Sequence, residues 1–410
     1  MNLRIIFALF FCLSACRAQQ PAAVEKEAKT ETKKTEVEEK KSFEPVSAPK
    51  QESFNLFLIL PLDLSTAFTF DSIVVDSVYV SEYIDKDVKA VIDFYEGALL
   101  AVDSLRKNGA DINLKVIDLP GNEELQISAI WKINFENCNA VFSMLRSKPL
   151  STLNEILQAK NIPLISCAAN SFSQTEKNKN AICMQPSSLM QCRKMGENSG
   201  ADFKNDNFII VTASTDKEQE RAHAFINGIE KYIPASQIKK INLALEGRAA
   251  FNKMLSGAGT NTIFVPSTDE DFVTNVFAAI DSALDIYRFR VIGLPVWQHF
   301  ESIDPQTMEK FNTVVFAPDY VNYNSPAVFN FRKKFRQVFR TEPGDGAYLS
   351  FDSFSLFGNY ISGNELYKTE YRYSGLRSSY YFVRENPEGA LENQWINILL
   401  LSGFRFIKVN

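Results

Sequence analysis

Residues suited to acid–base or nucleophilic chemistry are few and scattered in this chain of 410 residues. Only two histidines are present, His223 in a charged stretch and His299 close to Trp297. The carboxylate clusters at 123–124 and 269–271 are typical of solvated turns. The sequence contains no nucleophile elbow, phosphate-binding loop, HExxH motif or glycine-rich dinucleotide motif in strand context. We therefore expect a protein that is not an enzyme and that holds no metal and no cofactor.

Four cysteines follow residue 50, and none belongs to a CxxC motif or to a His/Cys cluster that would bind zinc. Cys138 precedes a predicted strand and Cys167 ends another. If those strands are parallel neighbours, the two thiols lie at opposite ends and beyond disulfide reach. An oxidising compartment permits a Cys183–Cys192 or a Cys167–Cys183 bridge, and four free, mostly buried thiols are an equal alternative.

Another cysteine, Cys16, ends a segment with a basic start, an apolar run from Ile5 to Leu13 and two small residues. This pattern is typical of a secretory signal peptide and is too short to span a membrane. Leu13-Ser14-Ala15-Cys16 resembles the lipobox of bacterial lipoproteins. The resemblance implies cleavage after residue 15 and attachment of lipid, such as palmitate, to Cys16. The alternative is an ordinary signal peptide with an incidental cysteine.

Residues 16–53 have the composition of a tether. Lysines and glutamates nearly balance, and between Pro21 and Glu52 the only aromatic residue is Phe43. Such a segment buries too little apolar surface to offset its ordering entropy, so we expect disorder, with a root-mean-square span of roughly 30–35 Å. A specific interaction tail is the alternative. The segment has no one-sided basic block, which argues against nucleic acid as a partner.

From residue 54 onward, predicted strands alternate with predicted helices. Apolar runs predict strands at 54–60, 113–118, 140–144, 162–166, 208–212, 242–245, 262–265 and 289–293. Helical spacing predicts helices at 88–105, 151–160, 219–232 and 272–283, and residues 69–80 read as an extended insert. Right-handed crossovers between such strands give parallel sheets covered on both faces. The predicted fold is α/β, with two doubly wound parallel-sheet lobes.

Several segments carry a family resemblance in a consistent order. The predicted helix at 94–105 resembles the first long helix of type I periplasmic binding proteins of the Leu/Ile/Val-binding branch. Ile162-Pro163-Leu164-Ile165-Ser166 and Gly293-Leu294-Pro295-Val296-Trp297 resemble two of that family's strand-end motifs. Segments 331–343 and 350–352 resemble its later helices, and 375–382 with Asn393 resembles a Bacteroidetes-type branch related to LysM-associated members.

The resemblance implies one binding-protein-like domain at 54–410, with two lobes joined by a hinge. It places lobe 1 at about 54–184 and 313–365, and lobe 2 at about 185–312 and 366–410. Ligands of open α/β sheets bind beyond the carboxyl ends of the strands. Counting those ends gives the expected ligand-binding residues Asp63, Asp118, Ser143, Ser166, Asn170, Thr212, Ser214, Glu246, Ser267, Trp297, Tyr320 and Asp352.

Purely structural interpretations compete with these roles. Asp118 can brace the turn before Pro120, Ser166 can satisfy backbone at a strand end, and Trp297 can belong to a core. Asp352 is placed to cap a helix that begins near residue 353. The chain also departs from amino-acid-binding relatives, because Cys167-Ala168-Ala169-Asn170 replaces their hydroxyl-rich segment.

Two functions fit this interpretation. The first is a lipid-anchored envelope protein that binds or senses a small polar solute, such as an amino acid, a peptide or a muropeptide. The alternative is a non-catalytic outer-membrane scaffold or activator that acts on a peptidoglycan synthase or another envelope complex, and 33 phenylalanines would suit a plugged cleft. Because Arg17 follows Cys16 and no acidic cluster does, we expect the periplasmic face of the outer membrane.

Overall fold

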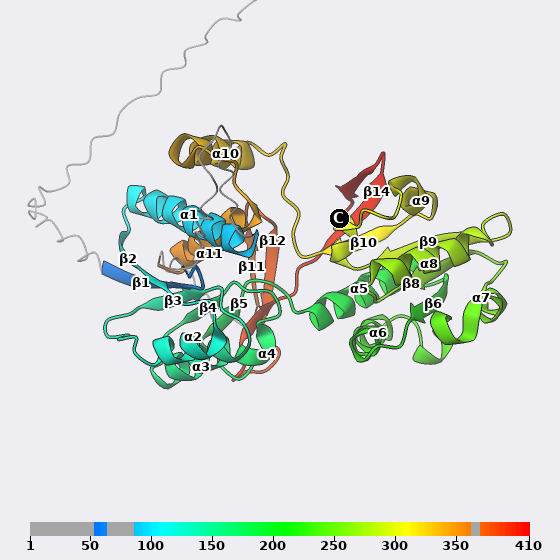
Figure 1. The fold of residues 1–410 in the computed structure, drawn as a ribbon, viewed down its shortest axis with the longest axis horizontal. Helices are drawn as coiled ribbons and strands as arrows, with labels where there is room; N and C mark the ends of the chain where they lie inside the picture. The colour runs from blue at the N-terminus through cyan, green and yellow to red at the C-terminus, as the bar shows by residue number, and fades with distance from the viewer. Residues whose placement is uncertain (1–52, 64–85, 362–369) are drawn as a thin grey trace, which may run out of the picture. The chain divides into compact units, whose positions relative to one another are not determined.

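The computed structural model describes residues 53–63, 86–361 and 370–410, which form two sheets with flanking helices (Figure 1). The expected signal peptide, the lipidated Cys16, the tether and the extended insert at 69–80 lie outside the described residues. Among the helices that the structure describes, none has the length and apolarity needed to cross a bilayer.

The first sheet has eight strands in the order β11-β12-β13-β5-β4-β3-β1-β2. β1 to β5 and β13 are mutually parallel, whereas β11 and β12 add an antiparallel edge. The strands are β1 (Ser53–Leu60), β2 (Asp111–Asp118), β3 (Ala140–Ser143), β4 (Leu164–Ser166), β5 (Ala181–Cys183), β11 (Glu370–Ser374), β12 (Ser379–Val383) and β13 (Leu391–Asn393).

Helices cover both faces of this sheet, which is why β1 is apolar along almost its whole length. α1 (Lys86–Lys107) and α11 (Asp345–Ile361) pack on one face, and α2 (Glu123–Ile130) and α3 (Ser147–Ala159) on the other (Figure 1). α4 (Phe172–Thr175) is a short helix before β5, and α10 (Pro326–Phe339) packs outside α1 and α11.

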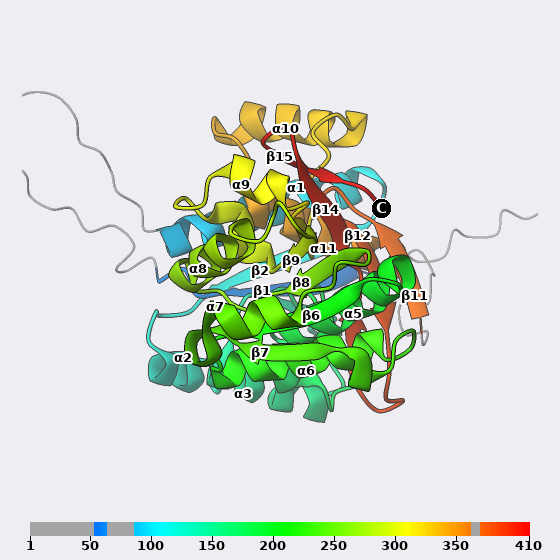
Figure 2. The ribbon, with the colours of Figure 1, turned by 90° about the vertical axis from the view of Figure 1, so that its right-hand side faces the viewer.

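The second sheet has seven strands in the order β15-β14-β10-β9-β8-β6-β7. In Figure 2, α8 lies on one side of β8 and β6, and α6 lies on the other. The strands are β6 (Asn207–Thr212), β7 (Lys239–Asn242), β8 (Thr260–Phe264), β9 (Arg288–Gly293), β10 (Val314–Ala317), β14 (Asn397–Ser402) and β15 (Arg405–Lys408). The helices are α5 (Ser188–Phe203), α6 (Asp216–Ile229), α7 (Leu243–Met254), α8 (Glu270–Asp281) and α9 (Pro305–Lys310), with 3₁₀ turns η1 (Ala235–Gln237) and η2 (Pro295–His299).

The predicted fold class is confirmed, since both sheets are mostly parallel and carry helices. The expected segment boundaries of the two lobes need a correction at two places. β10 pairs with β9 and therefore belongs to the second sheet, and β11 to β13 join the first sheet beside β5. The chain thus passes between the sheets at 184–187, at 318–325 and at 394–396.

The structure also tests two local predictions, a strand at 242–245 and the state of the cysteines. The predicted strand at 242–245 is wrong, because the strand ends at Asn242, whose side chain accepts a hydrogen bond from the Leu245 amide and begins α7. The four cysteines after residue 50 are free, and three of them are buried. Cys138 precedes β3 and Cys167 follows β4, and because these strands are parallel the two thiols lie at opposite ends, as expected.

Candidate functional site

The carboxyl ends of β1 and β2 are braced by two carboxylates. The Asp63 amide donates to Oδ1 of Asp118 at 2.9 Å, and Oδ2 of Asp63 accepts from the Gly121 amide at 2.9 Å. Asp63 has a φ of 46°, a left-handed conformation that such contacts help to hold. This geometry favours the turn-bracing interpretation of Asp118.

Ser143 and Ser166 occupy directly paired positions at the ends of β3 and β4. Both side chains are fully buried, but only Ser143 has a partner, because its Oγ accepts from the Leu145 amide at 3.1 Å. The Ser166 hydroxyl has no hydrogen-bond partner among the described residues. A buried polar group without a partner is costly. Four other described side-chain atoms share this state, but of the five only the Ser166 hydroxyl lies at the carboxyl end of a strand, where ligands of such sheets bind.

The loop after β4 offers further donors next to Ser166. The amides of Ala168 and Ala169 make no hydrogen bond to another residue in the described part of the chain. Asn170, with a φ of 57°, accepts from the Ser188 amide through Oδ1 at 2.7 Å and so caps the first turn of α5. Arg146 is exposed and lies between β3, the neighbour of β4, and the start of α3. The ends of β3 and β4 therefore present hydrogen-bond donors, and one cationic side chain, Arg146, stands at the start of the helix after β3.

In the second sheet, the structure brings together three of the predicted residues. Thr212, Ser214 and Glu246 line one hollow of about 170 Å³ beside β6 and β7. Asn242 links them, since its Nδ2 donates to Ser214 Oγ at 2.7 Å and its amide donates to Glu246 Oε1 at 2.9 Å. The strand-end count therefore finds neighbouring residues here, although Glu246 lies in the first turn of α7 rather than after a strand.

Trp297 lies in the core of the second lobe. Its side chain is 1 % exposed, its Nε1 donates to the Ser267 carbonyl at 3.0 Å, and its ring contacts Phe277 and Phe300. Ser267, another predicted residue, is also buried. The geometry corrects the expectation that Trp297 covers a ligand and supports its interpretation as a core residue.

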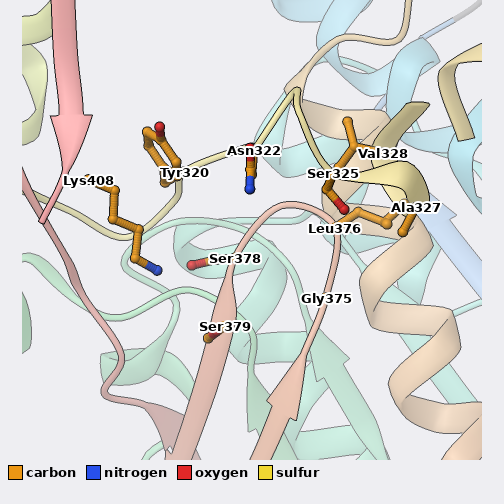
Figure 3. Close-up of a pocket in the computed structure, with 10 residues that line it drawn as sticks. All are labelled: Tyr320, Asn322, Ser325, Ala327, Val328, Gly375, Leu376, Ser378, Ser379 and Lys408. Carbon is orange, nitrogen blue, oxygen red and sulfur yellow. The ribbon is translucent and has the colours of Figure 1, made fainter. Parts of the chain in front are cut away.

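Tyr320 lies in the connection after β10 and lines a different cavity, of about 260 Å³, with the β11–β12 turn and Lys408 (Figure 3). Its amide donates to the Arg377 carbonyl at 2.9 Å. Tyr320 is therefore separated along the sheets from the predicted residues at β1 to β4 and at β6 and β7. Of the predicted residues, Asp352 contacts the same turn, since it accepts from the Arg377 amide.

A buried polar network at the β11–β12 turn escaped the sequence analysis. Arg377 is 4 % exposed and forms a bidentate pair with Asp345 at 2.8 and 2.9 Å, with Asp319 at 3.5 Å. Because Asp319 follows β10, this arginine ties a connection between the sheets to the first lobe. No periodic signal marks Arg377, since its partners are distant in sequence.

Asp352 belongs to the same network. It lies inside α11, which begins at Asp345, so the prediction that it caps a helix near residue 353 is wrong. Its carboxylate accepts from the amides of Leu376 and Arg377 and from the Tyr380 hydroxyl. Burial nevertheless raises the pKa of Asp352 to about 6. Within the described ranges, the structure contains no cluster of three side chains suited to a metal ion.

Comparisons with known proteins place the fold. No family model matches the chain, and no curated protein does. Among solved structures, a putative branched-chain amino acid ABC transporter from Rhodospirillum rubrum has a TM-score of 0.62 at 12% identity, with 87% of this chain and 100% of that chain covered. An ABC transporter substrate-binding protein from Desulfitobacterium hafniense in complex with Leu has a TM-score of 0.54 at 16% identity, with the same coverage. A solute-binding protein from Rhodopseudomonas palustris BisB5 in complex with 3,4-dihydroxy benzoic acid has a TM-score of 0.52 at 14% identity, with 87% and 96% covered. The chain thus has the two-lobe fold of periplasmic binding proteins.

Proposed function

We propose that this protein binds a small solute with an anionic group at the carboxyl ends of its two sheets. The observation that carries the proposal is the buried, unpartnered hydroxyl of Ser166, next to the unused amides of Ala168 and Ala169. Hydroxyl and amide donors suit a carboxylate. Two proteins with this fold hold solutes that carry a carboxyl group, Leu and 3,4-dihydroxy benzoic acid.

The hollow beside β6 and β7 would contribute the second half of the site. Glu246 is exposed there, and Ser214 and Asn242 add hydroxyl and amide groups. A solute with a carboxylate at one end and donors at the other, such as an amino acid or a small peptide, would satisfy both groups. Hinge closure between the lobes would bring the two halves together.

Ser166→Ala provides the test, with Ser143→Ala as its matched control. Because the buried Ser166 hydroxyl has no protein partner, we expect Ser166→Ala to leave the free energy of unfolding unchanged or to raise it by up to about 1 kcal/mol. Ser143→Ala leaves the Leu145 amide unpaired and should cost about 1 kcal/mol or more.

Amino acids, peptides and muropeptides are screened by thermal shift, and hits are measured by calorimetry. Ser166→Ala should weaken a hit about tenfold, and Ser143→Ala should weaken it much less. A screen without hits, or a hit that binds Ser166→Ala as it binds wild type, would overturn the proposal and favour the envelope scaffold.

The proposal includes a lipid anchor at Cys16, on the periplasmic face of the outer membrane. It is supported by the signal-peptide pattern and by the resemblance of Leu13-Ser14-Ala15-Cys16 to a lipobox. Several acyl chains, each worth about 0.8 kcal/mol per buried CH₂, would hold the protein stably on a membrane.

Cys16→Ser should therefore move the protein from the membrane fraction to the soluble fraction of its own cells. Cys12→Ser, within the apolar run, is the matched control and should leave the protein in the membrane fraction. Sedimentation of Cys16→Ser with outer membranes in high salt would contradict the anchor.

A further inference from the structure

A cavity of about 260 Å³ lies between the β11–β12 turn, the connection at 318–325 and the last strand, β15. Its wall joins residues of both lobes, since Ser378 lies beside β12 of the first sheet and Lys408 ends β15 of the second. In Figure 3, the Lys408 side chain extends in the direction of Ser378, which lines the same cavity, and the Asn322 amide nitrogen points toward that space.

Lys408 is the charged group of this cavity. It is half-buried, and no carboxylate within the described residues lies within ion-pair distance of it. The Lys408 ammonium makes a cation–π contact with Trp395, with Nζ 5.3 Å from the centroid of the ring. Burial lowers the pKa of Lys408, as expected for a cation without a counter-ion.

The neutral polar groups around Lys408 are oriented as donors. Oδ1 of Asn322 accepts from the Asn324 amide at 3.1 Å, which leaves the Nδ2 donors for the cavity. Oγ of Ser378 accepts from Nδ2 of Asn397 at 3.0 Å, so its proton is free to point elsewhere. Ser325 precedes α10 without a side-chain cap, and after Pro326 the residues Ala327 and Val328, in the first turn of that helix, also line the cavity.

Carboxylates are absent from the residues that line this cavity. The nearby Asp345 and Asp319 pair with Arg377, and Asp352 accepts from the backbone of the turn. The acids are therefore paired with groups of the turn, and the residues that line the cavity supply one cation and several donors. That combination is complementary to an oxyanion.

The structure assigns to this cavity a binding site for a small oxyanion, a carboxylate or a phosphate, held by Lys408, Asn322 and Ser378. The site is distinct from the proposed solute site. The strand order reverses between β1 and β3 in the first sheet and between β6 and β8 in the second. Ligands of open α/β sheets bind at such points. The cavity instead lies at β12 and β15, beyond the connections between the lobes.

The test titrates the mature full-length protein with sodium phosphate and, separately, with sodium acetate, at constant ionic strength and followed by calorimetry. We expect saturable one-to-one binding of at least one anion. Binding of phosphate alone identifies a phosphate site, binding of acetate alone a carboxylate site, and binding of both a general oxyanion site. Absence of saturable binding of either anion would overturn the assignment.

Two variants address the cavity and one serves as control. Lys408→Met should weaken binding at least tenfold, and Asn322→Asp, which adds a negative charge to the wall, should abolish it. Lys132→Met removes an exposed lysine that follows α2 and should leave binding unchanged. Equal binding by wild type and Lys408→Met, or equal loss in Lys132→Met, would refute the site.

Folding is checked by circular dichroism and by the melting temperature without anion, so that a misfolded variant is recognised. Ser166→Ala separates this site from the proposed solute site, because it should leave phosphate and acetate binding intact. If it removed binding of the same anion, that anion would occupy the site at β4, and the assignment to Lys408 would be wrong.

Discussion

Trp297 shows how one buried side chain separates a structural role from a binding role. The ring lies among Phe277 and Phe300, and its Nε1 is already paired with the Ser267 carbonyl. A tryptophan that covers a ligand would be exposed before binding and would be needed for affinity. A core tryptophan is needed for stability whether or not a ligand is bound.

We therefore expect Trp297→Ala to lower the free energy of unfolding by about 3–5 kcal/mol, both with and without solute. Trp131, which is 64 % exposed, provides the control, and Trp131→Ala should cost less than about 1 kcal/mol. Urea unfolding followed by circular dichroism measures both. A stable Trp297→Ala protein that has lost solute binding would show that this tryptophan belongs to the binding site.

At the scale of elements, the α1–α11 interface combines close backbone packing with buried carboxylates. A Cβ at Gly97 would lie 2.2 Å from the Ala347 carbonyl oxygen, so only glycine permits this approach. Asp93 and Glu96 lie on the same helix, and Oε2 of Glu96 has no hydrogen-bond partner in the described structure. Burial, with a smaller contribution from Asp93, raises the pKa of Glu96 to about 7.

The raised pKa of Glu96 predicts a definite pH dependence. The folded protein holds this proton more tightly than the unfolded chain, so the contribution of Glu96 to stability is present below its ordinary pKa of 4.5 and is lost as the pH rises to about 7. Glu96→Gln removes the titration. The stability of the variant relative to wild type should therefore increase between pH 4.5 and pH 8.

Urea unfolding at the two pH values measures this difference. Glu155→Gln, at an exposed position on α3, serves as the control and should remain within about 0.5 kcal/mol of wild type at both. A stability difference between Glu96→Gln and wild type that does not change with pH would show that the proton at Glu96 is not linked to folding.

The same elements show what a sequence reveals. The apolar run of β1 and the helical spacing of α1 were sufficient to predict both elements, because burial dictates their patterns. The boundary between β7 and α7 was missed, because Asn242 begins a helix where the apolar pattern continues. No local sequence pattern predicts that Leu391 pairs with Ile182, because the two residues are distant in sequence. The position of β11 to β13 in the first sheet is therefore known only from the structure.

The candidate site likewise contains residues that the sequence predicts and contacts that only the structure reveals. Counting strand ends, a rule of the fold class, selects Thr212, Ser214 and Glu246, which line one hollow, although Glu246 lies in α7 rather than at a strand end. The missing partner of Ser166 and the contacts of Lys408 depend on how distant segments pack. A single sequence therefore identifies the strand ends but does not distinguish a satisfied hydroxyl such as that of Ser143 from an unsatisfied one.

At the scale of the whole molecule, the connections between the sheets bind the lobes through specific side chains. Asn397 at the start of β14 is fully buried, and its Nδ2 donates to the Ala317 carbonyl at 3.2 Å and to Ser378 at 3.0 Å. Arg377 joins Asp319 to Asp345 across the second connection. In the order of the sheets, a hinge axis through these connections would pass between the strands of the proposed solute site (β3, β4, β6 and β7) and those of the Lys408 cavity (β12 and β15).

Groups on opposite sides of such an axis move in opposite senses when the lobes rotate. An oxyanion that holds Lys408 close to Ser378 would favour one relative orientation of the lobes and would oppose closure over a solute at β4 and β6. We therefore expect saturating phosphate or acetate, whichever binds, to weaken solute binding several-fold. By linkage, saturating solute must weaken anion binding by the same factor.

Calorimetric titrations of each ligand, with and without the other, measure the two factors. Lys408→Met should bind the solute with one affinity, whether or not the anion is present, because it has lost the second site. Direct competition is excluded if the effect of the anion on solute affinity reaches a limit as the anion concentration rises. If both ligands bind and neither affects the other, the connections transmit no rotation between the two sites, and the Lys408 site acts independently of solute binding.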